Sequence, residues 1–369
     1  MSNTGAPRII ISGGGTGGHV FPAIAIADSI KAKVPGVEIL FVGAQGKIEM
    51  EKVPQAGYPI EGLWISGFQR SLSLRNLLFP VKLVYSLLKA RTIIRKFKPQ
   101  VAVGVGGYAS GPLLEIATRF GIPALIQEQN SYAGVTNKLL SKKVQKVCVA
   151  YTGMEKFFPA EKIVLTGNPV RRVLAQASYP AAARLHFGLN ADLPTLLIFG
   201  GSLGALSINE AMAQNTVFWQ ANGNIQVLWQ CGGSHYEKYQ NCATAQLSNV
   251  KLSAFIDRME LAYAAAEVVC SRAGALTISE LCLVGKPAIL VPSPFVAEDH
   301  QTKNAQALVD KNAAIMVANG ETVSQLLPLA LELLQNETKR NTLAHNILAL
   351  AKPNAAEEIA EQVLGLVKF

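Results

Sequence analysis

Short runs of β-branched and aliphatic residues alternate with amphipathic stretches along the whole chain, and this alternation constrains the fold more than any other feature. It is typical of parallel sheets covered by helices on both faces. The strands expected in the first half are Arg8–Ser12, Val37–Val42, Val101–Val105, Ala124–Gln127, Lys146–Ala150 and Lys162–Thr166. Those expected in the second half are Thr195–Phe199, Ile225–Gln230, Val250–Phe255, Val268–Ser271, Ala288–Val291 and Ala314–Val317. The sequence therefore predicts an α/β chain of two Rossmann-like parallel-sheet domains.

The break between the two domains is expected at Gly167–Arg171, because Pro169 cannot continue a central strand there. The first domain would then span residues 1–167 and the second residues 168–354. With 369 residues, half of them apolar, the chain is long enough to build two packed cores. The final stretch, residues 355–369, has apolar residues at helical spacing, and we expect it to pack back on the first domain.

The net charge of +9 favours an anionic partner: nucleic acid, a phosphorylated substrate or an acidic lipid surface. Nucleic acid is the weaker explanation, since the sequence has neither aromatics interleaved on a basic strand nor a helix-turn-helix pattern. The five cysteines have no C-x-x-C spacing and are expected to be reduced core residues of a cytosolic protein. No secretory signal and no apolar run of roughly 18 residues is found, which predicts a soluble or peripheral protein.

A glycine-rich loop, Gly13–His19, follows the first expected strand, and a helix is expected to begin near Pro22. Glycines let the backbone approach a ligand, and helix N-terminal amides favour an anion, so the loop suits a diphosphate. It also fits the G-x-G-x-x-G pattern of dinucleotide-binding dehydrogenases. Such a site has an acid at the end of the second strand, whereas Val37–Val42 runs into Gly43–Gly46 without a carboxylate. A glycine turn needed only for packing is the remaining alternative.

Two loops in the second half have similar character. The segment Gly200–Gly204 matches the G-x-S-x-G elbow of hydrolases, but a hydrolase explains neither the preceding Rossmann-like domain nor the first glycine loop. Ser202 is more simply a hydrogen-bond donor to phosphate. In Ser271–Glu280 small residues leave room for a ligand, and Glu280 is placed to accept hydrogen bonds from ribose hydroxyls, with a dipole-favourable helix acid as the alternative.

Six motifs follow one another along the chain: Gly14–Pro22, Gly106–Pro112, Glu128–Asn130, Gly167–Arg171, Gly200–Ala205 and Ser271–Glu280. Together they resemble the bacterial N-acetylglucosaminyltransferases of peptidoglycan synthesis, over nearly the whole chain. The resemblance implies a GT-B fold, in which two Rossmann-like domains face each other across a cleft. It also implies UDP-N-acetylglucosamine as donor, a lipid-linked undecaprenyl-pyrophosphate acceptor, and inversion at the anomeric carbon to give a β-1,4 linkage.

Carried over motif by motif, the resemblance places the donor on the second domain. It implies that Arg171 and Ser202 meet the donor phosphates, and that Ile256 contacts the uracil. Gln301 would reach the sugar hydroxyls. The residues implied to hold diphosphate and ribose are Ala275, Leu276, Thr277, Ile278, Ser279 and Glu280. The first domain would contribute Thr16, Gly17, Gly18 and Asn130 over sugar and acceptor, and Gly107 and Tyr108 on the acceptor side.

Two positions depart from the family pattern. A histidine commonly precedes the Glu-Gln-Asn triplet, and Gln127 stands there instead, which argues against a catalytic role at that position. A second glutamine commonly follows Gln301, and here it is Thr302. This weakens sugar recognition at residue 302 and leaves Gln301 unaffected.

Inverting transfer in a single displacement needs a base for the acceptor hydroxyl and stabilisation of the leaving UDP. His19 is the candidate base, because an imidazole with a pKa of about 6.5 accepts a proton at cellular pH. The alternative is that His19 only binds the acceptor diphosphate or caps its helix; Glu128 is the reserve base. No D-x-D occurs and the five histidines lack metal-ligand spacing, so no cofactor is expected, with a divalent metal at most stimulatory.

Between Leu72 and Pro99, apolar residues are interleaved with lysines and arginines. This mixture suits an anionic membrane surface, although a helix covering a sheet has a similar pattern. The lipid-linked acceptor favours the membrane, so we expect a peripheral protein at the cytoplasmic face of the bacterial inner membrane. Proteins of cell-wall synthesis and division are candidate partners. Two other functions stay open: a GT-B transferase with another donor or acceptor, and a non-catalytic subunit that binds nucleotide sugars.

Overall fold

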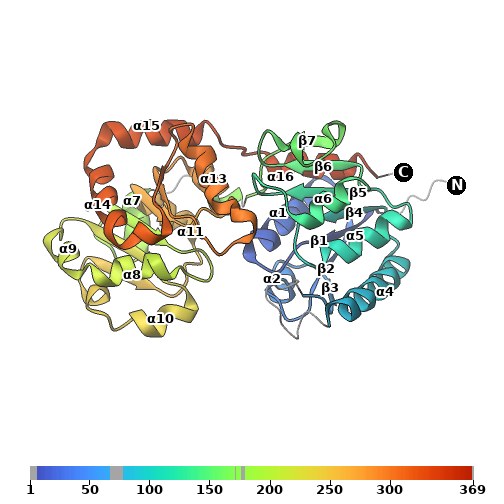
Figure 1. Ribbon diagram of the computed structural model, residues 1–369, viewed down its shortest axis with the longest axis horizontal. Coiled ribbons are helices and arrows are strands. Elements are labelled where there is room, and N and C mark those ends of the chain that lie inside the picture. Colours follow the sequence, from blue (N-terminus) through green and yellow to red (C-terminus); the bar gives the residue numbers. More distant parts are fainter. Residues whose placement is uncertain (1–5, 67–77, 171, 176–178, 368–369) are drawn as a thin grey trace. The chain divides into compact units, whose positions relative to one another are not determined.

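The computed structural model describes residues 6–66, 78–170, 172–175 and 179–367, and the chain divides into two compact units. Unit 1 comprises residues 1–171 together with 353–369, and unit 2 comprises residues 172–352 (Figure 1). The first boundary between the units follows Arg171, the last residue of the segment Gly167–Arg171 in which the sequence predicts the boundary between domains. The chain therefore passes between the units twice.

Unit 1 contains a sheet of seven parallel strands in the order β3-β2-β1-β4-β5-β6-β7. Its strands are β1 (Arg8–Ser12), β2 (Glu38–Ala44), β3 (Ile60–Leu63), β4 (Val101–Gly104), β5 (Ala124–Glu128), β6 (Lys146–Val149) and β7 (Ile163–Leu165). Its helices are α1 (Gly17–Lys33), α2 (Glu49–Gln55), α4 (Phe79–Phe97), α5 (Ser110–Arg119), α6 (Val135–Ser141) and α16 (Ala355–Leu364).

Unit 2 contains a sheet of six parallel strands in the order β10-β9-β8-β11-β12-β13. Its strands are β8 (Thr195–Phe199), β9 (Gln226–Gln230), β10 (Val250–Ser253), β11 (Val268–Ser271), β12 (Ala288–Leu290) and β13 (Ile315–Met316). Its helices are α7 (Pro180–His186), α8 (Leu206–Gln214), α9 (Thr216–Ala221), α10 (Gly233–Tyr239), α11 (Met259–Ala265), α12 (Ala275–Val284), α13 (His300–Val309), α14 (Thr322–Gln335) and α15 (Glu337–Leu348).

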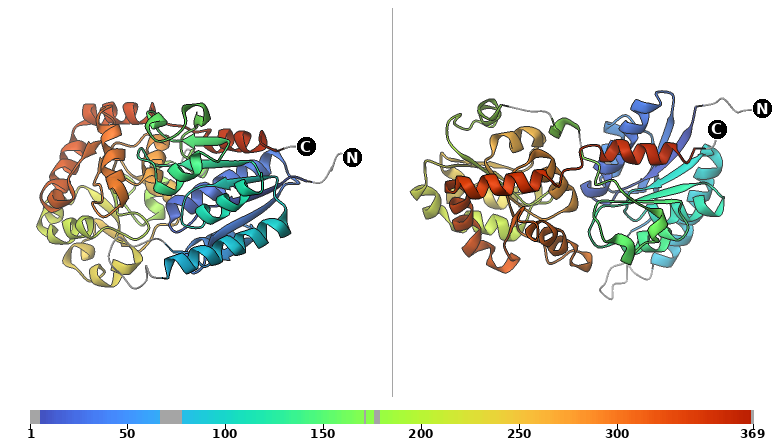
Figure 2. Two further views of the ribbon diagram at one scale, coloured as in Figure 1. Left: turned by 45° about the vertical axis from the view of Figure 1, so that its right-hand side comes forward. Right: turned by 90° about the horizontal axis from the view of Figure 1, so that it is seen from above.

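Alternating side chains along the buried strands build a core on each face of the sheet of unit 1. Ile9 and Ile11 of β1 join the core under α1, α2 and α16, whereas Ile10 joins the core under α4, α5 and α6. Figure 2 (left) shows the sheet between the red α16 and the cyan α4. Since both faces are covered, the central strands are mainly apolar and lack the polar alternation of a half-exposed sheet.

The helix α16 belongs to unit 1 although it follows unit 2 in the sequence. Ile359, Ala360 and Val363 are fully buried in the core that also contains residues of α1. Lys33 of α1 forms an ion pair with Glu361 of α16 at 2.7 Å. Residues 353–369 thus bring the chain back to the sheet on which it began.

The predicted fold class is confirmed: each expected strand is present, and half of the strand ends are exact while the others shift by one or two residues. The sequence analysis missed β3. Its residues, Ile60–Leu63, include a glutamate and a glycine, and among the described strands they pair with β2 alone, at the edge of the sheet. A short edge strand of this composition lacks the β-branched run from which the others were predicted.

The five cysteines are free thiols, and all but Cys242 are buried, as predicted for reduced core residues. Burial raises the pKa of Cys148, Cys270 and Cys282 to about 12, so these thiols stay protonated at neutral pH. Within the part of the chain that the structure describes, no helix has the length and apolar character needed to cross a bilayer.

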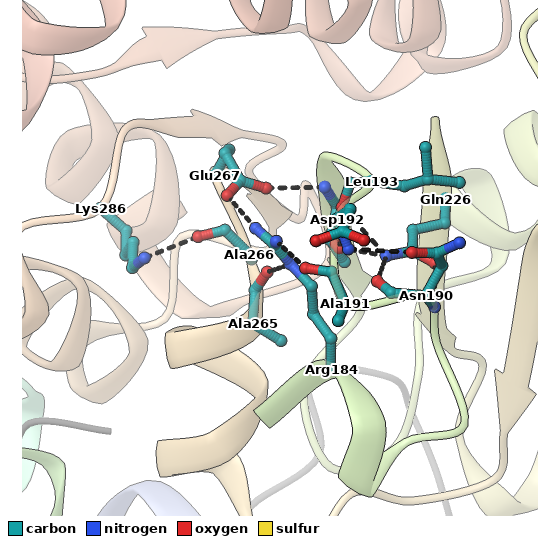
Figure 3. Close-up of polar contacts among 11 residues, drawn as sticks. Arg184, Asn190, Ala191, Asp192, Leu193, Gln226, Ala265, Ala266, Glu267 and Lys286 are labelled. Atoms are coloured by element: carbon teal, nitrogen blue, oxygen red, sulfur yellow. Dashed lines mark hydrogen bonds and ion pairs between the residues drawn. The ribbon is translucent and has the colours of Figure 1, made fainter. Parts of the chain in front are cut away.

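A polar network closes the amino-terminal edge of the unit 2 sheet (Figure 3). Arg184 of α7 pairs with Glu267, which directly precedes β11, and donates to the carbonyl of Ala265 at 3.1 Å. Glu267 also accepts a hydrogen bond from the amide of Thr195, the first residue of β8, at 2.6 Å. Because the two charges compensate each other at the edge opposite the glycine loops, this network has a structural role.

Candidate active site

The loops singled out from the sequence lie at the carboxyl ends of central strands in each unit. In unit 1, β1 is flanked by β2 and β4, and the loops after β1, β4 and β5 share one edge. In unit 2, β8 is flanked by β9 and β11, and the loops after β8, β11 and β12 share one edge. Both edges are topological switch points, where open α/β sheets bind ligands.

The first glycine loop ends earlier than predicted. The helix α1 begins at Gly17 and not near Pro22, because the carbonyl of Thr16 already accepts a hydrogen bond from the amide of His19 at 3.1 Å. Pro22 lies inside the helix, where its missing N–H removes a single helical hydrogen bond. Thr16 is the N-cap, and Gly17, Gly18 and His19 form the first turn.

His19 is half-buried and is held by its own loop. Its Nδ1 lies 3.1 Å from the carbonyl oxygen of Gly14 and 3.4 Å from Oγ1 of Thr16. The loop after β4 makes room for this arrangement. A Cβ on Gly106 would lie 2.5 Å from Cδ2 of His19, and a Cβ on Gly107 would lie 2.3 Å from the Gly14 oxygen. Both glycines also have positive φ. Lack of space for a Cβ and the backbone conformation therefore both favour glycine at these two positions.

Tyr108 follows these two glycines and borders the same loop. Its side chain is 51% exposed, and its ring atoms lie 4.0 Å from the position that a Cβ on Gly15 would take. Gly107 and Tyr108, predicted on the acceptor side, are thus beside the loop that carries His19.

Glu128, the last residue of β5, is buried and its two oxygens are engaged. Oε1 accepts hydrogen bonds from the backbone amide and the side-chain amide of Asn130, at 3.1 and 3.3 Å. Oε2 accepts from the amide of Gly134 at 3.0 Å and from Nδ2 of Asn137 at 2.9 Å. The carboxylate therefore organises the loop that presents Asn130.

Gln127 is buried beneath the same loop. Its Nε2 donates to Oδ1 of Asn168 at 2.8 Å, and Nδ2 of Asn168 donates to the carbonyl of Gln129 at 3.0 Å. Position 127 thus ties β5 to the segment that leads into unit 2. Arg171, implied to meet the donor phosphates, lies outside the described residues.

The sequence analysis missed Glu49, the first residue of α2. Its side chain is fully buried, and it accepts hydrogen bonds from the amide of Gly15 at 2.8 Å and from that of Ala44 at 2.9 Å. A Cβ on Gly14 would lie 2.2 Å from its Oε1. A carboxylate does therefore reach the end of β2, contrary to the sequence prediction, but the protein's own amides occupy it and no ribose can reach it.

In unit 2, the loop after β8 packs tightly on the end of β9. A Cβ on Gly204 would lie 1.9 Å from the carbonyl oxygen of Cys231, and Nε2 of Gln230 donates to the carbonyl of Gly201 at 2.9 Å. Ser202 is exposed at the tip of this loop. The glycines hold the backbone in place and leave the serine accessible.

The helix α12 begins after the loop that follows β11, with Gly274 as its N-cap. Along it Ala275, Leu276, Thr277 and Ser279 are partly exposed, whereas Ile278 and Glu280 are buried. Oε2 of Glu280 accepts a hydrogen bond from the hydroxyl of Tyr263 at 2.9 Å, and Tyr263 packs edge-on against Phe199. The Glu280 carboxylate is therefore oriented by the core.

The other predicted donor residues differ in exposure. Ile256 is 4% exposed, so its side chain belongs mainly to the core, while Phe255 beside it is 50% exposed. Oε1 of Gln301 accepts a hydrogen bond from the amide of Ser293, just after β12, at 2.8 Å. Thr302 donates to Asp299 at 2.7 Å within the first turn of α13.

Arg272, in the loop after β11, was given no role by the sequence analysis. Its Nη1 donates to the carbonyls of Val291 and Pro292, both at 3.1 Å. Nη1 also donates to Oδ1 of Asn319 at 2.8 Å, and Nη2 to Oγ of Ser207 at 3.2 Å. Burial lowers the pKa of the guanidinium to about 10, so it is still charged at neutral pH. None of these four partners is an acid.

Comparison with known proteins decides the family. Two family profiles match: the glycosyltransferase family 28 N-terminal domain over residues 9–149, and the family 28 C-terminal domain over residues 195–363. A UDP-N-acetylglucosamine–N-acetylmuramyl-(pentapeptide) pyrophosphoryl-undecaprenol N-acetylglucosamine transferase of Cytophaga hutchinsonii is 56% identical over 98% of this chain and 97% of its own length. The chain belongs to glycosyltransferase family 28.

Other family 28 relatives agree. A Bacteroides fragilis protein of the same name is 54% identical over 98% of this chain and 96% of its own length. The crystal structure of Acinetobacter baumannii MurG matches with a TM-score of 0.76 and 30% identity, over 97% of this chain and 99% of that one. A UDP-N-acetylglucosamine 2-epimerase, at 12% identity and a TM-score of 0.69 over 98% of this chain and 95% of that one, shares the fold alone.

Membership of family 28 confirms the resemblance inferred from the six motifs, and with it the GT-B fold. The dehydrogenase and hydrolase alternatives, each based on one glycine loop, are wrong. Within the described residues, no group of three or more histidines, cysteines and acids is arranged to hold a metal ion.

Proposed function

We propose that the chain transfers N-acetylglucosamine from UDP-N-acetylglucosamine to the C4 hydroxyl of undecaprenyl-pyrophosphoryl-N-acetylmuramyl-pentapeptide, with inversion and release of UDP. The product is the β-1,4-linked lipid precursor of peptidoglycan. The observation that carries this proposal is the 56% identity to a transferase of that name over nearly the full length of both chains. The loops at the two switch points supply the chemistry that the reaction needs.

The donor half-site is the edge of unit 2 formed by the loops after β8, β11 and β12. Ser202 and the amides that begin α12 face the diphosphate. Arg171 lies outside the described residues, and its role at the phosphates is what the family resemblance implies. Glu280 accepts from the ribose hydroxyls, since Tyr263 holds its carboxylate in place. Ile256 lies beside the uracil and Gln301 beside the sugar. The buried charge of Arg272 favours an anion at this edge, because no acid is among its partners.

The acceptor half-site is the edge of unit 1 formed by the loops after β1, β4 and β5. Residues that line it are Thr16, Gly17, Gly18, Gly107, Tyr108 and Asn130. His19 is the base: it takes the proton of the C4 hydroxyl while that oxygen attacks the anomeric carbon, and the bond to UDP breaks with its electron pair on the β-phosphate. Glu128 supports Asn130, because both of its oxygens already accept hydrogen bonds.

The leaving diphosphate is stabilised by helix amides, Arg171 and Arg272, so no metal ion or other cofactor is required. This part of the proposal rests on the positive groups at the donor half-site and on the absence of a D-x-D sequence.

The membrane surface is the outer face of α4. Its exposed apolar side chains are Val81, Val84, Tyr85 and Leu88. Trp64 adds an exposed ring that packs edge-on against Tyr85. The ammonium of Lys82 lies over the Trp64 ring, at 5.5 Å from its centroid. The part of the predicted stretch before Leu78 lies outside the described residues. Exposed apolar side chains beside a lysine suit an anionic bilayer, and this supports a peripheral position, which we propose to be the cytoplasmic face of the inner membrane. Division and cell-wall proteins are candidate partners there.

The membrane surface is tested by co-sedimentation with phosphatidylglycerol vesicles. Leu88→Glu on α4 is expected to weaken binding strongly, whereas Leu185→Glu, a similarly exposed leucine of α7, leaves it unchanged. Failure of the parent chain to bind acidic vesicles at any salt concentration would remove the membrane from the proposal.

The transfer itself is tested with radiolabelled UDP-N-acetylglucosamine and a short-chain acceptor analogue. The parent chain is expected to form labelled disaccharide product and UDP, and competition by UDP should exceed that by other nucleotides. A chain that binds UDP but forms no product by itself would support a non-catalytic subunit instead.

A further inference from the structure

One peptide group links a buried carboxylate to the imidazole of His19. The N–H of Gly15 and the C=O of Gly14 belong to the same trans peptide and point in opposite directions. The N–H donates to Oε2 of Glu49 at 2.8 Å, and the C=O lies 3.1 Å from Nδ1 of His19. Carboxylate, peptide and imidazole therefore form one continuous hydrogen-bonded chain.

The carbonyl end of this chain fixes the tautomer of His19. A carbonyl oxygen can only accept, so the ring nitrogen that faces it carries the proton. With the proton on Nδ1, the lone pair of the neutral ring is on Nε2, the nitrogen that the proposed reaction requires as base. The hydroxyl of Thr16, at 3.4 Å from Nδ1, is compatible with this tautomer because it can also accept.

The carboxylate end contributes the charge. Glu49 is fully buried, and its second oxygen accepts from the amide of Ala44 at 2.9 Å, so its position is set by two backbone amides. In a medium of low dielectric, a negative charge at the N–H end of a peptide strengthens the acceptor at its C=O end. The imidazolium that forms when Nε2 takes a proton is stabilised in the same way.

Glycines of two loops are required for this arrangement. A Cβ on Gly14 would lie 2.2 Å from Oε1 of Glu49, and one on Gly43 would lie 2.4 Å from its Cγ. A Cβ on Gly106 would lie 2.5 Å from the His19 ring. Gly14 in the first motif, together with Gly43 and Gly106, thus makes room for the side chains of Glu49 and His19.

We infer that Glu49 is a positioning residue for the base: through the Gly14–Gly15 peptide it holds His19 with its proton on Nδ1 and makes Nε2 a better proton acceptor. The inference rests on the proposed function, since it assigns Glu49 a part in that reaction. It resembles the carboxylate that orients histidine in hydrolase triads, with a peptide inserted between the two groups.

The first test is the ¹⁵N spectrum of the histidine rings of the parent chain at neutral pH, with His19→Ala used to assign the signal. We expect the Nδ1–H tautomer for His19. The Nε2–H tautomer would overturn the inference, and this reading does not depend on activity or on any variant of Glu49.

The second test is Glu49→Gln, which has the same shape, no charge and one acceptor oxygen in place of two. We expect the Nε2–H tautomer to increase and kcat to fall about 10- to 100-fold, less than the roughly 10⁴-fold seen when the carboxylate contacts the histidine directly. KM for UDP-N-acetylglucosamine and the affinity for UDP should stay within about twofold, because both depend on unit 2. Unchanged kcat and tautomer would overturn the inference.

Glu49→Asp keeps the charge on a shorter side chain and is expected to recover part of kcat. Glu267→Gln is the matched control: it removes another hydrogen-bonded carboxylate, at the amino edge of unit 2, and should lower the melting temperature without changing the His19 signal. If Glu49→Gln does not fold, the parent spectrum and Glu49→Asp decide. A parent chain that transfers no sugar contradicts the proposed function. Its ¹⁵N spectrum still tests whether Glu49, through the Gly14–Gly15 peptide, holds His19 with its proton on Nδ1.

Discussion

The two units use the same strand, glycine loop and helix, yet the charged groups behind their loops have opposite signs. In unit 1 the carboxylate of Glu49 accepts from Gly15 and thereby occupies an amide that would otherwise face an anion. In unit 2 the guanidinium of Arg272 connects the loop after β11 to α8 and to the end of β12, and its partners within the described ranges are uncharged. The glycine pattern alone therefore does not identify the diphosphate site; the sign of the buried charge behind it distinguishes the two loops.

A second arginine of unit 2, Arg184, differs from Arg272 in having an acidic partner. Arg184, at the amino edge of the sheet, pairs with Glu267, and the two charges compensate each other (Figure 3). Among the residues that the structure describes, Arg272, at the carboxyl edge, has no acidic partner. A half-buried cation without an anion is costly unless a ligand supplies the negative charge, which is the reason to place UDP at this edge.

The largest effect is expected from unit 1. His19→Ala removes the base, and kcat should fall about 10²- to 10⁴-fold, with UDP affinity unchanged because the donor half-site is intact. The measurement is steady-state transfer together with calorimetric titration of UDP. A variant that loses UDP binding as well as turnover would contradict the separate roles of the two loops.

The next effect concerns Arg272, the arginine whose partners in the described part of the chain are uncharged. Arg272→Met should weaken UDP binding by about 30-fold, on the order of 2 kcal/mol, and uridine binding much less, since only UDP carries the diphosphate. Arg184→Met is the control: it should lower the melting temperature and leave the ratio of UDP to uridine affinity unchanged. If the affinities for UDP and for uridine fall by the same factor, Arg272 has a structural role and does not bind the diphosphate.

A smaller effect is expected at the ribose. Tyr263→Phe removes the hydroxyl that holds Glu280 and should raise KM for UDP-N-acetylglucosamine about 5- to 10-fold, as the loss of one ordinary hydrogen bond would. Glu280→Ala should have the larger effect on the same constant. If Tyr263→Phe changes kcat and not KM, the carboxylate does not act in donor binding.

The smallest effect is expected from removing metal ions. Because the donor half-site supplies its own positive groups, treatment with a chelator should change turnover by no more than about twofold. The measurement is the transfer rate before and after chelation and after magnesium is added back. Complete loss that magnesium restores would show that Arg272 and the helix amides do not suffice.

Much of the fold followed from the sequence because the central strands are buried on both faces and contain continuous apolar runs, such as Ile9–Ile11 and Leu196–Phe199. The loops were found for a related reason, since glycine after a strand is a local signal. The start of α1 was misplaced because Pro22 suggested a first turn, whereas the Thr16 carbonyl had already closed one.

The residues that the sequence did not reveal form hydrogen bonds with residues that are far from them in the sequence. Glu49 lies 34 positions from its partner Gly15, and Tyr263 lies 17 from Glu280. No acid follows β2 directly in the sequence, and Glu49 lies five positions beyond Ala44, the last residue of that strand. Whether an acid lies beside Arg272 depends on packing, and no local sequence pattern indicates that its described partners are uncharged.

The position of α16 has a consequence for how the protein forms on the ribosome. All of unit 2, residues 172–352, is synthesised before the helix that completes unit 1. Until residues 355–364 emerge, the apolar side of α1 that they cover stays open to solvent, so the unit translated first is the last to close its core.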